Sequence, residues 1–89
     1  MLEIVPTRQF QKDLTKASKR GKSLDKMGLV IDCLADQKPL PLRHNDHILT
    51  GNYSKHRECH VEPDWLLIYK ATEEELVLVR TGTHSDLFK

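Results

Sequence analysis

The hydrophobic pattern of the chain changes its period once, and this change constrains the fold more than any other feature of the sequence. Between residues 7 and 35, apolar side chains recur every three or four positions, as they do on amphipathic helices. From residue 56 onward they alternate with polar residues or form short continuous runs, as they do in strands. The sequence therefore predicts an α+β domain whose helices precede most of its strands.

The first half predicts a strand followed by two helices. Residues 2–5 are apolar and include β-branched side chains, which favours a strand. Thr7 is suited to cap a helix that runs to about Lys19, and Ser23 is suited to cap a second helix. Pro39 ends the second helical pattern and begins a long polar loop. Two adjacent amphipathic helices joined by a short turn indicate a helical hairpin laid on a sheet.

The second half predicts three strands. Residues 56–62 alternate between two faces, residues 65–69 form a strongly apolar run, and residues 76–79 are suited to pair with that run as a hairpin. Residues 80–84 are expected to carry the last strand into a short tail. The order βααβββ predicts a single domain over residues 1–89. Its two-helix hairpin covers one face of a small, mostly antiparallel sheet, and the other face is left for function.

Composition and charge exclude several classes of protein. The chain has no apolar run near the ~20 residues that span a membrane and no secretory signal, so we expect no membrane partner. Its two cysteines cannot form a disulfide scaffold, which favours a reducing cytoplasm. The net charge is +1, but the charges are unevenly distributed along the chain. Nine basic and five acidic residues lie up to Asn45, and five basic and eight acidic residues lie after it. The basic half is suited either to a polyanion or to a solvated helix face.

Five histidines in 89 residues call for a test of metal binding. His56 and His60 share a strand face but lie about 13 Å apart at ~3.3 Å per residue, which is too far to bind one ion. His44 and His47 could chelate an ion from a loop, but no cysteine pair or His-Glu-x-x-His helix completes the set. The sequence therefore predicts no metal ligands and no cofactor.

General acid–base chemistry remains, because His47, His60, Asp64 and His84 can exchange protons and Arg80 supplies a fixed cation. Metal-free cleavage of RNA needs this set. A base takes the proton of the 2′-OH, an acid protonates the leaving 5′-oxygen, and a cation stabilises the charge that develops on the phosphate. DNA lacks the 2′-OH and would not react in this way.

Two aromatic residues, Trp65 and Phe88, could stack on unpaired bases. Each candidate also has a purely structural interpretation. A strand histidine can be a hydrogen-bonded structural residue, Asp64 a turn former, Trp65 a core residue, Arg80 the partner of a glutamate, and Phe88 a plug that holds the tail. Residue types and spacing alone leave a ribonuclease as one option among several.

Two segments carry a resemblance to a known family. Residues 57–70 read RECHVEPDWLLIYK and residues 80–88 read RTGTHSDLF. Together they closely resemble the YafQ-type toxins of the RelE/ParE superfamily, and the similarity extends over essentially the whole chain. One position departs from the family pattern, since Ile48 follows His47 where the family usually has proline.

The resemblance implies a RelE-like fold and a bacterial type II toxin. Such a toxin is an endoribonuclease that cleaves mRNA in the translating ribosome, next to rRNA, and a ribbon-helix-helix antitoxin neutralises it. The expected products are a 2′,3′-cyclic phosphate or 3′-phosphate and a 5′-hydroxyl. Two alternatives stay open: a ParE-like toxin that acts by binding a protein, and a ribonuclease that needs no ribosome.

The resemblance also assigns roles to residues. His47 and His84 are expected to form the acid–base pair, with Asp64 and His60 as orienting or alternate proton-transfer groups. The side chains expected to bind RNA are Trp65, Arg80 and Phe88.

Overall fold

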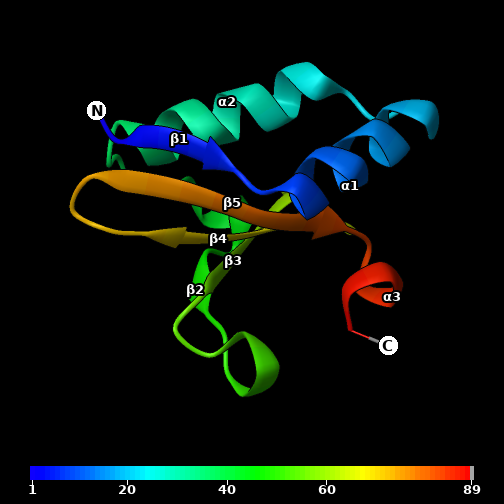
Figure 1. Ribbon diagram of the computed structural model, residues 1–89. Helices are drawn as coiled ribbons and strands as arrows, with labels where there is room; N and C mark the ends of the chain where they lie inside the picture. Colours follow the sequence, from blue (N-terminus) through cyan, green and yellow to red (C-terminus); the bar gives the residue numbers. More distant parts are fainter. Residues whose placement is uncertain (89) are drawn as a thin grey trace.

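Two helices lie along one face of a five-stranded sheet, and a short third helix follows the last strand (Figure 1). The computed structural model describes residues 1–88. In chain order the elements are β1 (Glu3–Pro6), α1 (Arg8–Lys19), α2 (Leu24–Ala35), the 3₁₀ turn η1 (Leu42–His44), β2 (His47–Ile48), the 3₁₀ turn η2 (Gly51–Tyr53), β3 (Arg57–Glu62), β4 (Trp65–Ala71), β5 (Glu75–Gly82) and α3 (His84–Leu87). Within residues 1–88, no helix is long and apolar enough to cross a membrane.

The strands are ordered β1-β5-β4-β3-β2 across the sheet. The first strand pairs with β5 in parallel, and every other neighbouring pair is antiparallel. Parallel pairing requires a long connection, which the intervening helices and strands supply. The predicted α+β fold, with a helical hairpin on a mostly antiparallel sheet, is therefore confirmed.

Local sequence signals set the ends of the two long helices. The side-chain oxygen of Thr7 accepts a hydrogen bond from the backbone N–H of Phe10 at 3.0 Å, and the side chain of Ser23 accepts one from the N–H of Lys26. These bonds satisfy N–H groups that have no partner inside the helix. Gly21 follows α1 with φ of +84°, a left-handed conformation that glycine adopts without strain. Both predicted caps are confirmed.

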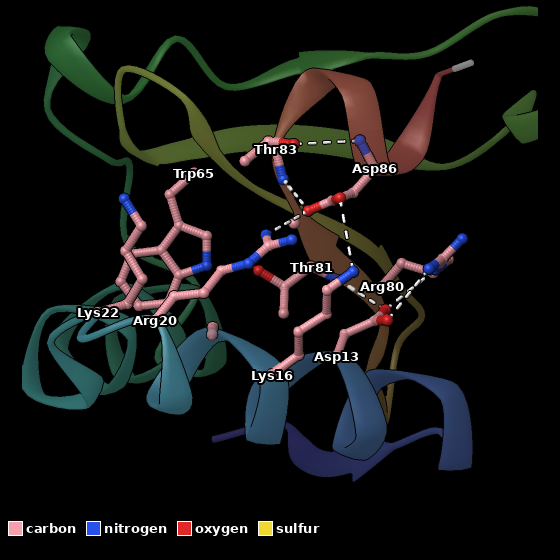
Figure 2. A pocket seen from close by; sticks show the side chains of 11 residues that line it. Asp13, Lys16, Arg20, Lys22, Trp65, Arg80, Thr81, Thr83 and Asp86 are labelled. Carbon is pink, nitrogen blue, oxygen red and sulfur yellow. Dashed lines mark hydrogen bonds and ion pairs between the residues drawn. The ribbon is translucent and has the colours of Figure 1, made fainter.

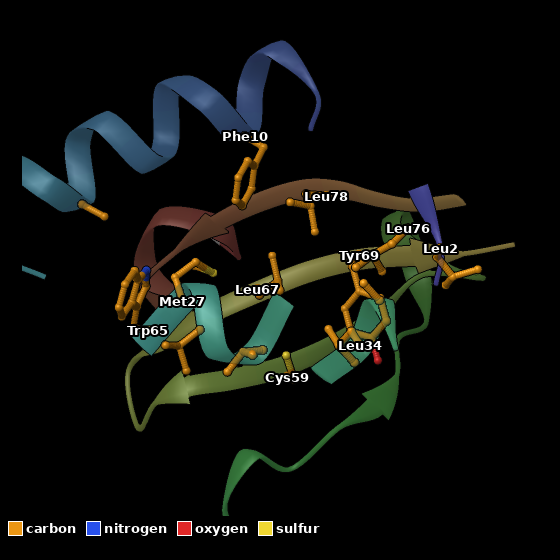
Figure 3. Close-up of a cluster of buried hydrophobic side chains, with 14 residues drawn as sticks. Leu2, Phe10, Met27, Leu34, Cys59, Trp65, Leu67, Tyr69, Leu76 and Leu78 are labelled. Carbon is orange, nitrogen blue, oxygen red and sulfur yellow. The ribbon is translucent and has the colours of Figure 1, made fainter. Parts of the chain in front are cut away.

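The main core lies between the helices and the sheet (Figure 3). Phe10 of α1 and Met27 of α2 are each 2% exposed and pack in one cluster with Trp65, Leu67 and Leu78 of the sheet. Burial of apolar surface on this scale is what holds the hairpin on the sheet. The helices therefore cover most of this face.

Two elements were missed by the sequence analysis. Residues 47–48 form the short edge strand β2 instead of continuing the polar loop, and the last strand ends at Gly82 instead of at residue 84. Thr83 then caps α3 through a capping box with Asp86, so the predicted tail is a helical turn. This helix packs close to the strand end, because a Cβ at Gly82 would lie 2.9 Å from the Cβ of Asp86.

A smaller apolar cluster lies on the opposite face of the sheet. Its buried members are Leu66, Ile68 and Leu87, and Leu49, Tyr53 and Val79 pack against them. The expectation that this whole face is left for function is therefore wrong in part. The turn η2 and helix α3 cover some of it, and the polar residues described next lie beside this cover.

Candidate active site

Pairing of β2 with β3 brings two histidines to one buried carboxylate. The register places His47 opposite Glu58, and alternation along β3 places His60 on the same face as Glu58. The Nε2 atoms of His47 and His60 each lie 3.3 Å from Oε1 of Glu58. The side chain of Glu58 is 6% exposed, so this carboxylate is held between the two rings at the surface of the sheet.

A second polar pair joins the turn between β3 and β4 to the first residue of α3. The Nδ1 atom of His84 lies 2.6 Å from Oδ1 of Asp64, and the backbone N–H of His84 donates to the same oxygen at 3.0 Å. These two hydrogen bonds, the backbone one first, lower the pKa of Asp64. Asp64 therefore stays ionised and fixes the orientation of the exposed His84 ring.

The two groups meet through their rings. The ring centroids of His60 and His84 are 5.7 Å apart in an edge-to-face arrangement. The structure thus brings all four predicted acid–base residues into one continuous surface, which we call the histidine row. Its members are His47, Glu58, His60, His84 and Asp64.

Arg80 is anchored by a carboxylate on α1. Its Nε and Nη2 atoms donate to the two oxygens of Asp13 at 3.0 and 3.1 Å. This pairing, with a smaller contribution from Tyr53, raises the pKa of Arg80. The side chain is 28% exposed, so Arg80 offers a rigid, permanently charged group at the surface.

The two aromatic candidates have different environments. Phe88 is 43% exposed and packs edge-to-face against Tyr53 at 5.9 Å, so one side of its ring is open. Trp65 is 1% exposed and lies in the main core. The expectation that Trp65 stacks on a base is not supported, because an indole buried between helices and sheet presents no open face. Its alternative interpretation as a core residue fits the structure.

Sequence reasoning missed Glu58 and Tyr53. Glu58 carried a detectable signal, since alternation places it on the same strand face as His60. Its role as the shared partner of His47 and His60 depends on the pairing of β2 with β3, which was not predicted.

The two histidines outside the row contact backbone carbonyls instead. His44 contacts the carbonyl of His60, and His56 contacts the carbonyl of Ser54.

One set of side chains in the row has the geometry of a metal site. The candidate ligand atoms of His47, Glu58 and His60 lie within 4.8 Å of one another. Two imidazoles and one carboxylate form a donor set that suits zinc or other divalent transition metals. The sequence reasoning tested other histidine pairs and excluded a metal on that basis, so it did not consider this set.

Comparison with known proteins places the chain among bacterial toxins. A family model described as "Bacterial toxin of type II toxin-antitoxin system, YafQ" matches residues 2–89. The mRNA interferase toxin YafQ of Escherichia coli K12 is 44% identical to the chain over 81 residues. The match covers 90% of this chain and 88% of that protein.

Solved structures agree with the sequence matches. The E. coli DinJ–YafQ complex contains a chain that is 41% identical, with a TM-score of 0.91 over all of both chains. A metal-bound toxin from Helicobacter pylori is 42% identical, with a TM-score of 0.93 over 99% of this chain and all of that chain.

Proposed function

The chain belongs to the YafQ family of bacterial toxins, which are part of type II toxin–antitoxin systems, and from this premise we propose its activity. We propose that it is an endoribonuclease that cleaves mRNA in the translating ribosome. The E. coli relative is named an mRNA interferase, and the proposed substrate comes from that name. The observation that carries the proposal is the histidine row, in which two carboxylates orient three imidazoles on one surface.

His84 is prepared for proton transfer at one ring nitrogen. Because Asp64 is ionised, it accepts the N–H at Nδ1 and keeps the proton on that atom. When the ring is neutral, its Nε2 atom can then accept a proton from the substrate. When the ring is an imidazolium, its Nε2–H can donate one. Asp64 acts as a positioning residue that sets the tautomer and the ring orientation.

His60 is the better second proton-transfer group. Both nitrogens of His47 have partners, Nε2 toward Glu58 and Nδ1 toward the carbonyl of Ile48. His60 uses Nε2 toward Glu58, and its Nδ1 has no hydrogen-bond partner among residues 1–88. We therefore assign proton transfer to His60 and His84 and give His47 a positioning role, in place of the expected pair of His47 and His84.

In the proposed reaction this chain supplies both proton-transfer groups and the cation. One imidazole removes the proton of the 2′-OH, whose oxygen attacks the adjacent phosphorus. The other imidazole protonates the leaving 5′-oxygen, which produces a 2′,3′-cyclic phosphate and a 5′-hydroxyl. Arg80, fixed by Asp13, stabilises the additional negative charge of the transition state.

The test is cleavage of a reporter mRNA on translating ribosomes. Wild type is expected to cut the message, and His84→Ala to lower the rate by about 10²–10⁴. His56→Ala is the matched control, because this histidine lies outside the row: its Nδ1 contacts the carbonyl of Ser54, and its ring packs edge-to-face against Tyr53. Equal cleavage by wild type and His84→Ala would remove His84 from the mechanism. Inhibited translation with intact mRNA would favour a toxin that acts by binding a protein.

The same assay on purified RNA tests the dependence on the ribosome. The proposal expects little cleavage without ribosomes, and rapid cleavage of naked RNA would indicate a ribonuclease that works alone. We further propose a cytoplasmic toxin that a ribbon-helix-helix antitoxin neutralises, since a YafQ chain is known in complex with DinJ. Co-expression of the neighbouring gene product and co-purification would test this partner.

The metal-bound relative raises the question of what a metal would do here. A transition-metal ion held by His47, Glu58 and His60 would supply a Lewis acid. It would also draw Glu58 away from His60 and place positive charge beside the ring that the proposed reaction uses for proton transfer. We therefore propose that metal binding opposes cleavage by this chain.

A further inference from the structure

A small pocket lies at the end of the sheet, between α1 and the start of α3 (Figure 2). Its volume is about 160 Å³. The walls come from the C-terminal half of α1, from Lys22, from the first residue of β4 and from the end of β5 with Thr83 and Asp86. This volume is suited to one small polar group and not to a nucleobase with its sugar. We call it the α1 pocket.

The α1 pocket is rich in positive charge. Four basic side chains line it against two acidic ones, namely Lys16, Arg20, Lys22 and Arg80 against Asp13 and Asp86. Arg80 pairs with Asp13, and Nη1 of Arg20 donates to Asp86 at 2.8 Å. Nζ of Lys22 lies 3.3 Å from Glu62, but Lys26 contacts the same carboxylate at 2.8 Å, so this pairing also leaves an excess of positive charge. Lys16 lies 3.7 Å from Asp86 and is 60% exposed, so its ammonium group is able to turn toward a ligand. An anion entering the pocket therefore meets more positive than negative charge.

A buried hydrogen-bond donor also faces this pocket. The Nε1–H of Trp65 is shielded from solvent and has no acceptor among residues 1–88. Trp65 lines the pocket, and its indole nitrogen lies on the ring edge that faces Thr81 and Arg20 (Figure 2). A buried donor without an acceptor is costly, and an anionic oxygen in the pocket would satisfy it.

The α1 pocket adjoins the histidine row. Trp65 directly follows Asp64 in the chain, and Thr83 directly precedes His84. On each of two separate segments, a residue that lines the pocket is therefore the chain neighbour of a residue of the Asp64–His84 pair. One residue of extended backbone spans about 3.3 Å. An RNA strand whose reacting phosphate lies at His84 can therefore place a neighbouring phosphate beside this pocket.

We propose that the α1 pocket binds a phosphate of the RNA strand next to the bond that is cleaved. This inference rests on the proposed function, because it identifies how the same site holds its substrate. Lys16, Lys22 and Arg20 would pair with the phosphate, and the indole N–H of Trp65 would donate to one of its oxygens. The position of the pocket, next to His84 and Asp64 in the chain, favours a phosphate of the substrate over a carboxylate from a protein partner. Trp65 would thus contact RNA through a hydrogen bond from its indole N–H and not by stacking of its ring on a base.

The chain has one tryptophan, so its indole N–H gives a single, unambiguous signal in a ¹H–¹⁵N correlation spectrum. The probe is a 2′-O-methyl trinucleotide, which cannot be cleaved by attack of the 2′-oxygen. A trinucleotide with neutral methylphosphonate linkages and a short acidic peptide complete the set, all at constant ionic strength. The proposal expects a saturable shift of the indole signal with the charged trinucleotide only.

Two double variants remove equal charge from different places. Lys16→Gln/Lys22→Gln is expected to weaken binding of the charged trinucleotide by about tenfold, the size of one hydrogen bond to a charged group. Lys12→Gln/Lys38→Gln removes two exposed lysines that do not line the pocket and is expected to bind like wild type. Equal weakening by both variants would show nonspecific attraction and overturn the proposal.

The remaining outcomes also decide the question. An unchanged indole signal, or the same shift with the neutral trinucleotide, would overturn the phosphate site. A saturable shift with the acidic peptide alone would assign the pocket to a protein carboxylate instead. Because the spectrum detects binding without cleavage, a shift combined with inactive toxin would preserve the pocket and reject the proposed function. Cleavage of mRNA by wild type without any shift of the indole signal would preserve the proposed function and reject the phosphate site.

Discussion

Replacing Asp13 with alanine is expected to destabilise the protein more than any substitution of an exposed acidic residue. Asp13 is 9% exposed and connects α1 to β5. Its oxygens accept two hydrogen bonds from Arg80, one from the backbone N–H of Thr81 at 3.3 Å and one from Gln9 at 2.9 Å. Alanine would leave the guanidinium of Arg80 and the buried N–H of Thr81 without these acceptors.

The size of the effect follows from burial. An exposed ion pair contributes about 0–1 kcal/mol, and breaking a fully buried one costs about 3–5 kcal/mol. With Asp13 9% exposed and Arg80 28% exposed, the pair lies between these limits. The lost hydrogen bond of Thr81 adds to the cost. We expect a loss of about 2–3 kcal/mol in the free energy of unfolding, or about 8–24 °C in Tm for a domain of this size.

The assay is thermal and urea unfolding followed by circular dichroism. Asp32→Ala is the matched control, because Asp32 is an exposed acidic residue on α2, and we expect its effect to stay within about 0.5 kcal/mol. Asp13→Asn should lie between the two, since the amide oxygen can still accept from Thr81. If Asp13→Ala unfolds like Asp32→Ala, the link between α1 and β5 does not contribute as the structure indicates.

Three further predictions concern the C-terminal helix and the histidine row. The pKa of Asp64 is lowered in the folded state, so its bond to His84 stabilises the fold above the ordinary carboxyl pKa and is lost as the pH falls through the lowered value. Wild type should therefore melt above Asp64→Asn at pH 7, and the two Tm values should converge as the pH falls through the lowered pKa; a constant difference would contradict this. Gly82→Ala places a Cβ 2.9 Å from that of Asp86 and should cost about 1–3 kcal/mol in urea unfolding, with reduced mRNA cleavage. Zinc should bind wild type in isothermal titration and inhibit cleavage until a chelator is added, and Glu58→Gln should weaken that binding by more than about tenfold; unchanged binding by Glu58→Gln would place the metal elsewhere.

The helical half of the fold was predictable from local sequence. Thr7 and Ser23 cap the two helices as expected, because a cap is decided by a side chain and the backbone three residues away. The hairpin of β4 and β5 was predicted for a similar reason, since a short polar turn joins two apolar runs. The helix α3 also had a local signal, the capping box of Thr83 and Asp86.

The candidate site was predictable only as a set of residues. His47, His60, Asp64 and His84 came from residue chemistry and from the family resemblance, but neither shows which of them meet. Glu58 joins His47 to His60 only through the register of β2 and β3. A register depends on packing between strands, and the two-residue strand β2 has too little pattern of its own to reveal it.

The sequence by itself therefore determined the fold class, the ends of the long helices and the kind of chemistry that the side chains can perform. The tertiary structure alone decided the partners: His84 with Asp64, 20 residues away, and Arg80 with Asp13, 67 residues away. It also decided that Trp65 lies in the core with its N–H toward a charged pocket. The physical reason is distance along the chain, because caps and periodicity act within a few residues, whereas partners in a site are chosen by packing of the whole sheet.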